Sequence, residues 1–319
     1  MSRTRRSLLL AAVAAAGSSL LAPAPAPAAE FINVLTGGQA GVYYPLGVAV
    51  EKLIAANLKD ARPSTQATKA SVENLQLLEE SKGEIAFTLG DSLQFAWDGN
   101  DEAGFPKPLK KLRAIAAIYP NYVQIVASKA SGVTSLADLK GKRLSVGAAR
   151  SGTELNTRAI LTAAGMSYKD LGKLEYLPFA ESVDLMKNRQ LDATLQSAGL
   201  GVASIRDLAT SLETVVVEVP AAIVAKVGSP YMAGVIPAKT YQGQERDVAT
   251  ALIPNYLVTR ADLSNDTVYA MTKAIFDNVP ALIAAHSAAK EIVMEAAPKN
   301  LPIPMHPGAE RYFKEKKLM

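Results

Sequence analysis

Apolar residues change their spacing between residues 31 and 58 in a way that predicts a strand followed by a helix. The run FINVL at 31–35 is apolar with a single polar break, as in a buried strand. From 43 to 58 the apolar positions recur three or four residues apart, so that Leu46, Val50 and Ile54 share one helical face. These two elements form the start of a βα unit.

The same alternation continues through the rest of the chain. A second helix is expected to begin at Ser71. The expected strands span 84–90, 113–120, 122–129, 143–149, 173–179, 190–199, 215–220 and 251–260. Further helices are expected at 135–142, 153–164, 181–188, 202–212, 265–278 and 279–296. We therefore predict an α/β fold with two sheets rich in parallel pairs, each covered by helices on both faces.

The pattern restarts near residue 121, which indicates a second lobe. We predict that 29–122 and 258–319 form the first lobe and that 123–257 form the second. Two lobes joined by two chain crossings enclose a cleft, and in open parallel sheets ligands lie at the carboxyl ends of strands, where helices begin. Candidate binding residues are therefore sought at the corners between strands and helices.

Residues 1–28 carry the features of an export signal. Three arginines precede an apolar run from Leu8 to Leu21, and a small-x-small cleavage site ends at Ala28. The run of 14 residues is shorter than a bilayer requires, which weighs against the alternative of a permanent membrane anchor. We predict a periplasmic protein, exported by the general secretory or the twin-arginine route.

Composition excludes several classes of function. The chain has 34 Lys and Arg residues against 30 Asp and Glu, and without the arginines of the leader the excess falls to one. No basic run offers a surface for the phosphates of a nucleic acid. The absence of cysteine excludes disulfides, thiolate metal sites and a cysteine nucleophile.

The corner after the first predicted strand is rich in glycine. Its sequence, TGGQAGV, matches neither the dinucleotide-binding G-x-G-x-x-G pattern nor a P-loop. Glycines still let a ligand approach the backbone, and the first N–H groups of the following helix favour an anion; an ordinary tight turn is the alternative. The candidate ligand-binding residues here are Thr36, Gly37, Gly38, Gly41 and Val42.

Two adjacent tyrosines open the helix that follows, and their side chains diverge by about 100°. One can pack in the core while the other faces the cleft. We take Tyr44 as the cleft residue, with core packing as the alternative. Tyr119, which ends a predicted strand before Pro120, is a second candidate of the same kind.

Two further corners carry hydroxyl residues at the start of a predicted helix. Ser71 opens one, with Asn74 one turn later, and Ser151, Gly152 and Thr153 open the other. Such residues commonly only cap a helix. Three helix N-termini at the same strand ends can nevertheless hold a carboxylate with neutral donors. At about 1.5–3 kcal/mol for each charge-assisted bond, three or four support roughly micromolar binding.

Asp91, Gln196 and Gly199 complete the candidate set. Asp91 follows a predicted strand and offers an acceptor to a ligand amine or hydroxyl, with a helix cap as the alternative. Gln196 ends another strand, with Gly199 just beyond it, and suits a neutral polar wall.

Signs of an enzyme are few. His286 and His306 are the two histidines, and neither has metal-ligand spacing to another ligand residue. The segment LQSAG lacks the first glycine of a nucleophile elbow. We predict no catalysis, no metal and no cofactor, and we assign His306 a structural role in a Pro-rich tail packed on the outside of a lobe.

Seven segments are informative together because of their order along the chain. They are TGGQAGVYYPLG at 36–47, SVENLQLL at 71–78, LADLKGKRLSVG at 136–147, SGTELNTRAIL at 151–161, LDATLQSAG at 191–199, IPAKTYQG at 236–243 and LPIPMHPGAERYFKE at 301–315. In this order they resemble the TAXI family of extracytoplasmic solute receptors, which serve tripartite ATP-independent periplasmic (TRAP) transporters. The resemblance covers nearly all of the chain after the leader.

That resemblance implies a two-lobed periplasmic-binding-protein fold of type II, with the ligand cleft between the lobes. It implies a receptor and not an enzyme. The implied ligand is a small organic acid, either a glutamate-like amino acid or a C4–C5 di- or 2-oxo-carboxylate, and the implied partner is a membrane permease.

One position departs from the pattern of that family, because Ala148, Ala149 and Arg150 precede the S-G-T motif where small residues are usual. Arg150 either faces solvent or adds a bidentate carboxylate contact, which would favour a dianionic ligand. Two other functions stay open at this point. One is a periplasmic sensor subunit for a membrane signalling protein, and the other is an exported enzyme on the same fold.

Overall fold

The computed structural model describes residues 30–319, and the predicted signal peptide at 1–28 lies outside them. In the described part, ten strands form one sheet in the order β2-β1-β3-β10-β4-β7-β5-β6, with β8 beside β4 and β9 beside β10. The strands are β1 (Glu30–Leu35), β2 (Ala61–Gln66), β3 (Ile85–Leu89), β4 (Leu112–Ser128), β5 (Arg143–Ser145), β6 (Lys173–Glu175), β7 (Ala193–Ala198), β8 (Thr214–Val217), β9 (Met232–Ile236) and β10 (Val248–Arg260).

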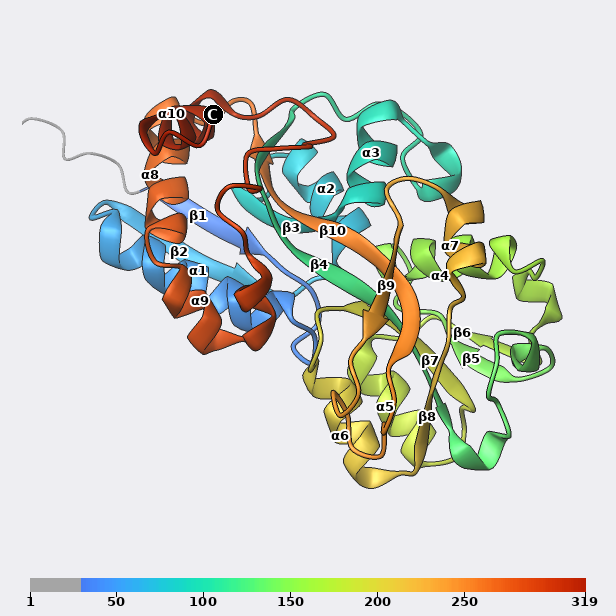
Figure 1. Ribbon diagram of the computed structural model, residues 1–319. Coiled ribbons are helices and arrows are strands. Elements are labelled where there is room, and N and C mark those ends of the chain that lie inside the picture. The colour runs from blue at the N-terminus through green and yellow to red at the C-terminus, as the bar shows by residue number, and fades with distance from the viewer. Residues whose placement is uncertain (1–29) are drawn as a thin grey trace, which may run out of the picture.

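Helices cover both faces of this sheet, as expected (Figure 1). They are α1 (Tyr43–Asn57), α2 (Ser71–Glu79), α3 (Gly90–Asp98), α4 (Gly152–Ala163), α5 (Phe179–Lys187), α6 (Ala203–Ser211), α7 (Ala221–Val227), α8 (Asn265–Phe276), α9 (Val279–Ala285) and α10 (Pro307–Glu315). None of the helices in residues 30–319 has the length and apolar character needed to cross a membrane.

Strands β4 and β10 are the longest, and they run antiparallel through both halves of the molecule (Figure 1). The expectation of separate strands at 113–120 and 122–129 is wrong, because β4 continues through Pro120. Pro120 lies opposite Pro254 in the ladder, and because proline has no N–H group, neither residue donates a hydrogen bond to the other strand at that point. The two halves of the molecule meet at this crossing.

The first half is built on β2, β1 and β3, which pair in parallel and meet β10 antiparallel. Side chains alternate between the two faces of β1. Ile32 and Val34 pack in one apolar cluster with Val50 of α1, whereas Leu35 packs in another with Leu75 of α2. Both faces of this strand are therefore buried under helices.

The second half repeats the plan with β7, β5 and β6. Helices α4 and α7 cover one face, where Ile160 and Val224 pack with Leu195. Helices α5 and α6 cover the other face, where Val183 and Ile205 belong to the same apolar cluster as the core of α1. Parallel pairs join β5 to its neighbours, and antiparallel pairs join β4 to β7 and β8.

Several elements differ from the expectation. The sequence patterns did not indicate β2, α3, α7, β9 or α10. The helix expected at 279–296 ends at Ala285, because His286 takes an extended conformation and caps the short 3₁₀ turn Ser287–Glu291. The tail at 301–319 contains α10, which begins at Pro307, a favourable residue for the first turn of a helix.

Candidate functional site

A cavity of about 130 Å³ lies between the two halves. The first half lines it with Gly37, Gly38, Gly41, Val42, Tyr43, Thr68, Lys69, Ala70, Ser71 and Leu89. The second half lines it with Ala148, Ser151, Gly152, Thr153, Pro178, Phe179, Ser197 and Ala198, and Asn121 of β4 lies at the crossing. The predicted residues that line the cavity are Gly37, Gly38, Gly41, Val42, Ser71, Ser151, Gly152 and Thr153.

Four helices begin at this cavity, and the N-cap residue and first helical residue of each line it. They are Val42 and Tyr43 of α1, Ala70 and Ser71 of α2, Ser151 and Gly152 of α4, and Pro178 and Phe179 of α5. The first N–H groups of a helix have no acceptor within that helix, and the helix dipole places partial positive charge there. The cavity therefore favours an anion.

The third N–H group of α2 and the third N–H group of α4 each have an acceptor within the protein. Arg150 O accepts from Glu73 N at 3.3 Å, and Ser151 Oγ accepts from Glu154 N at 3.2 Å. Within residues 30–319, no acceptor takes the first two N–H groups of either helix, at 71, 72, 152 and 153. Ser71, Gly152 and Thr153 line the cavity, so their N–H groups are available to a ligand, and the N–H of Val72 lies one residue further along α2.

Gly152 lets the starts of α2 and α4 meet. A Cβ atom at this position would lie 2.7 Å from Ser71 Oγ and 2.6 Å from Leu89 Cδ1, both in the first half. Because real Cβ atoms do not approach so closely, only glycine permits this contact between the halves.

Tyr43, and not Tyr44, faces the cavity, so the expectation for this pair is wrong. Tyr43 is the first residue of α1 and lies on the same helical face as Leu46 and Val50, which is the face that packs inward. Its hydroxyl donates to Asn255 Oδ1, and its ring stacks on another aromatic ring at 5.2 Å. Burial raises the pKa of Tyr43, which keeps the phenol protonated as a donor.

Asn121 and Asn255 connect the two crossing strands beneath the cavity. Asn255 Nδ2 donates to Asn121 Oδ1 at 2.7 Å and to Tyr119 O at 3.0 Å. Asn121 Nδ2 donates to Ser197 O at 2.8 Å. Both asparagines stand in the tripeptide Pro-Asn-Tyr, which occurs once in β4 and once in β10. The repeated tripeptide is therefore a signal in the sequence for the place where the two strands cross.

The family model described as the NMT1-like family matches residues 34–316. The chain belongs to the NMT1-like family. The match takes in all of the cavity lining and both crossing strands.

Solved structures identify the fold of this NMT1-like protein. PhnD1 from Prochlorococcus marinus, in complex with methylphosphonate, is similar with a TM-score of 0.58 and 13% identity, over 91% of this chain and 99% of that one. A putative L-cystine ABC transporter from Listeria monocytogenes is similar with a TM-score of 0.52 and 15% identity, over 83% and 98% of the two chains. The α/β fold is that of type II periplasmic binding proteins, as the resemblance implied, but the expectation of two sheets is wrong, because β4 and β10 run through both halves and join all ten strands of the described residues in one sheet.

Thr36 and Asn74 lie outside the cavity lining of this NMT1-like protein, where ligand contacts were expected. Both are fully buried and hold the loops in place. Asn74 Nδ2 donates to Thr36 O at 2.7 Å and to Phe87 O at 2.8 Å. Thr36 Oγ1 donates to Gln66 O at 2.7 Å. These bonds fix the glycine corner against the start of α2.

Tyr119, Gln196 and Gly199 also lie outside the lining. Gln196 Oε1 accepts from Ser204 Oγ at 2.5 Å, so this side chain packs toward α6. The next residue, Ser197, points to the other face of β7 and lines the cavity, as the alternation of a strand requires. A Cβ on Gly199 would lie 3.2 Å from the Tyr119 ring, which shows how closely these two residues pack.

Arg150 and Asp91 do not line the cavity either. Arg150 is exposed, with φ of 63°, and its carbonyl rather than its guanidinium serves the site. Asp91 is buried and is engaged by neutral donors of both halves, including Asn156 Nδ2 at 2.7 Å. Burial raises the pKa of Asp91.

Sequence reasoning missed part of the lining. The missed residues are Tyr43, Thr68, Lys69, Ala70, Leu89, Asn121, Ala148, Pro178, Phe179, Ser197 and Ala198. Phe179 was assigned to a strand at 173–179, whereas β6 ends at Glu175 and α5 begins at Phe179. The signal for that N-terminus is Pro178 with an acidic residue, Glu181, in the first turn.

The histidines have structural roles. Nδ1 of His306 accepts from Gly308 N at 3.1 Å and caps α10, and Nδ1 of His286 accepts from Ala288 N at 3.1 Å. His306 is 1% exposed, so it lies in the interior and not on the outside of a lobe as expected. Burial lowers the pKa of both histidines, which favours the neutral ring that such a cap requires. Within residues 30–319, no group of three His, Asp or Glu side chains could hold a metal ion.

Proposed function

We propose that this NMT1-like protein is a solute-binding receptor of a transport system, which takes a small organic acid into the cavity and delivers it to a membrane permease. The observation that carries the proposal is the meeting of four helix N-termini at one small cavity between two halves. The fold shared with PhnD1, solved with methylphosphonate, supports a small oxyanion as the ligand.

Binding is coupled to closure of the two halves in this proposal. We retain the division into a first lobe, 29–122 with 258–319, and a second lobe, 123–257. In the described structure the lobes touch, because Arg158 Nη1 donates to Glu102 O at 2.8 Å and Ser204 N donates to Ala40 O at 3.4 Å. A ligand that contacts both lobes shifts the equilibrium toward this closed form.

The sequence supports the proposed location and the proposed partner. The predicted export signal supports a periplasmic location, and the resemblance to the TAXI family supports a TRAP permease as the partner. The same resemblance gives the ligand classes, a glutamate-like amino acid or a C4–C5 di- or 2-oxo-carboxylate. A protein that presents a bound acid to a permease needs no catalytic group, and no acidic or histidine side chain lines the cavity.

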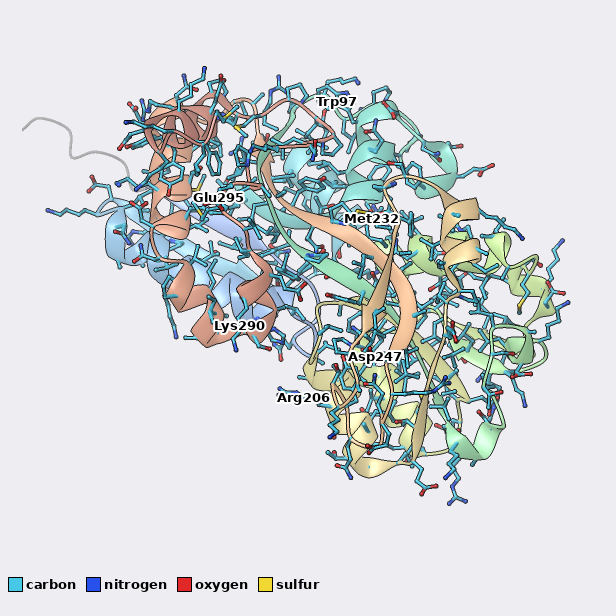
Figure 2. The ribbon with its side chains drawn as sticks, viewed as in Figure 1. Trp97, Arg206, Met232, Asp247, Lys290 and Glu295 are labelled. Atoms are coloured by element: carbon cyan, nitrogen blue, oxygen red, sulfur yellow. The ribbon has the colours of Figure 1, made fainter. Side chains whose placement is uncertain are left out.

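A thermal-shift screen tests this proposal. Trp97, the single tryptophan, lies at the far end of α3, away from the second half, so its fluorescence is a poor reporter of the cavity (Figure 2). A dye-based melting curve avoids this difficulty. At a concentration of about 100 times its Kd, a ligand stabilises by about 2.7 kcal/mol, which raises Tm by roughly 5 °C. Flat melting curves across a panel of small carboxylates, phosphonates and sulfonates would contradict the receptor function.

A further inference from the structure

The charge in the lining of the cavity is positive only. Lys69 is the one charged side chain among the residues that line it, and none of those residues is acidic. Two carboxylates lie one turn away in the sequence, but each has a partner. Glu73 Oε2 accepts from Lys69 N at 2.6 Å, and Glu154 forms an ion pair with Arg158 at 2.8 Å. Neither carboxylate lines the cavity, so neither lies beside a cationic group of a ligand bound there.

Asp91 is the third nearby carboxylate, and it is also saturated. One of its oxygens, Oδ2, accepts from Asn156 Nδ2 and from Tyr231 Oη, both at 2.7 Å. The other, Oδ1, accepts from Ser92 N at 2.6 Å. Because Asp91 lies outside the lining as well, it has no contact to offer to a ligand amine.

One buried hydroxyl in the lining has no partner. Ser197 of β7 is 5% exposed, and its Oγ makes no hydrogen bond within residues 30–319. An unpaired buried hydroxyl costs free energy unless a ligand or water completes it. This observation is independent of the helix N-termini and points to a polar ligand atom beside Ser197.

The volume of the cavity limits the size of the guest. An apolar cavity of about 150 Å³ holds benzene, a molecule of six carbon atoms. A cavity of about 130 Å³ therefore suits a ligand of similar size. Glutamate and the C5 dicarboxylates are larger molecules than benzene.

We propose that the natural ligand is a compact monocarboxylate without an ammonium group, such as a short 2-oxo or 2-hydroxy acid, and that amino acids are excluded. The inference rests on the proposed receptor function, keeps the small organic acid as its ligand, and sets aside the amino acids and the C5 dicarboxylates that the resemblance implies. The carboxylate binds the free N–H groups at the starts of α2 and α4, and the 2-oxo or 2-hydroxy oxygen completes Ser197 Oγ. An α-ammonium in the same position would be buried without a carboxylate partner, which is strongly unfavourable.

Matched pairs of acids test the inference by calorimetry on the purified protein. Pyruvate and alanine share a carbon skeleton and differ in the 2-substituent, as do 2-oxobutyrate and 2-aminobutyrate. We expect the 2-oxo acid of each pair to bind at least about 100-fold more tightly than its amino partner. If the amino acids bind as tightly, the receptor function stands and this inference fails. If no acid in a broad panel binds, the receptor function fails and the inference fails with it.

A matched pair of variants tests the role of Ser197. Thr194 lies on the same strand and also has a buried hydroxyl without a partner, but it does not line the cavity. Ser197→Ala should weaken binding of the tightest 2-oxo acid by about 10-fold, with an unchanged unfolding midpoint. Thr194→Val should leave the affinity unchanged. Equal affinities for the Ser197→Ala variant and the unaltered protein would overturn the assignment.

Discussion

Asp91 of α3 and Asn156 of α4 join the two halves of the molecule through a hydrogen bond of 2.7 Å. Tyr231 Oη, also from the second half, donates to the same carboxylate oxygen at 2.7 Å. Asp91 is 1% exposed, and no ion pair involves it in the described part of the chain. Asp91 is therefore a buried carboxylate held by neutral donors alone. Because both donors to Oδ2 come from the second half, these hydrogen bonds exist only when the halves are together.

Removal of this carboxylate should destabilise the closed protein. Asp91→Ala leaves the donors of Asn156 and Tyr231 buried and unpaired, so we expect a loss of about 3 kcal/mol in the free energy of unfolding, measured with urea. The control is Asp98→Ala, at an exposed position of the same helix, which should change stability by less than about 0.5 kcal/mol. Equal losses in the free energy of unfolding for the two variants would show that the hydrogen bonds of Asp91 do not stabilise the protein.

The same residue predicts a pH dependence. Burial raises the pKa of Asp91 in the folded protein above its value in the unfolded chain, about 3.9. The folded state then binds the proton more tightly, so the contribution of Asp91 to stability falls as the pH rises from about 4 through the folded pKa. In urea unfolding at several pH values, the advantage of the unaltered protein over Asp91→Asn should shrink across this range. Parallel curves for the two proteins would refute the expectation.

Gly152 should be required for closure more than for folding. In Gly152→Ala the new methyl group meets Ser71 and Leu89 of the other half, so the closed form is disfavoured while each half keeps its own core. We expect affinity for the bound acid to fall by at least about 10-fold, with a loss of stability no larger than the roughly 3 kcal/mol expected when the contacts of Asp91 between the halves are lost. Thr162→Ala is the control, because Thr162 is an exposed residue near the far end of the same helix and does not line the cavity. An equal loss of affinity in both variants would contradict this account of Gly152.

Tyr43 and Tyr44 provide a direct test of the orientation of α1. Tyr43→Phe leaves Asn255 Oδ1 without its donor and should cost about 1–3 kcal/mol in stability. Tyr44→Phe changes a half-buried position outside the cavity and should cost less than about 0.5 kcal/mol. A double-mutant cycle with Asn255→Ala should give a coupling energy for Tyr43 and none for Tyr44.

The fold could be predicted from the sequence because its periodic segments are local. The strand FINVL became β1, and the apolar face of Leu46 and Val50 placed α1. The continuity of β4 could not be seen in this way. Proline normally lies at the end of a strand or on an edge strand, whereas Pro120 lies within β4, which is held on both sides of this point by pairs with β10, a strand distant in the sequence.

Only part of the candidate site could be predicted from the sequence, because only part of it carries a local signal. Glycine and hydroxyl corners such as Gly37 and Ser151 carry their own local signal, and they line the cavity. Lining residues such as Asn121 and Ser197 sit within strands and reach the cavity only because the halves meet there. Spacing also cannot show which of two adjacent tyrosines faces inward when the helix axis is set by packing elsewhere.

In the proposed receptor, free N–H groups at the starts of α2 and α4, one helix from each half, hold the anion. Amide ¹⁵N and ¹H chemical shifts measured during titration with the tightest acid report on these groups residue by residue. We expect the largest shifts, and slowed hydrogen exchange on binding, at the amides of Ser71, Val72, Gly152 and Thr153. Saturable binding that leaves these four amides unchanged would contradict the claim.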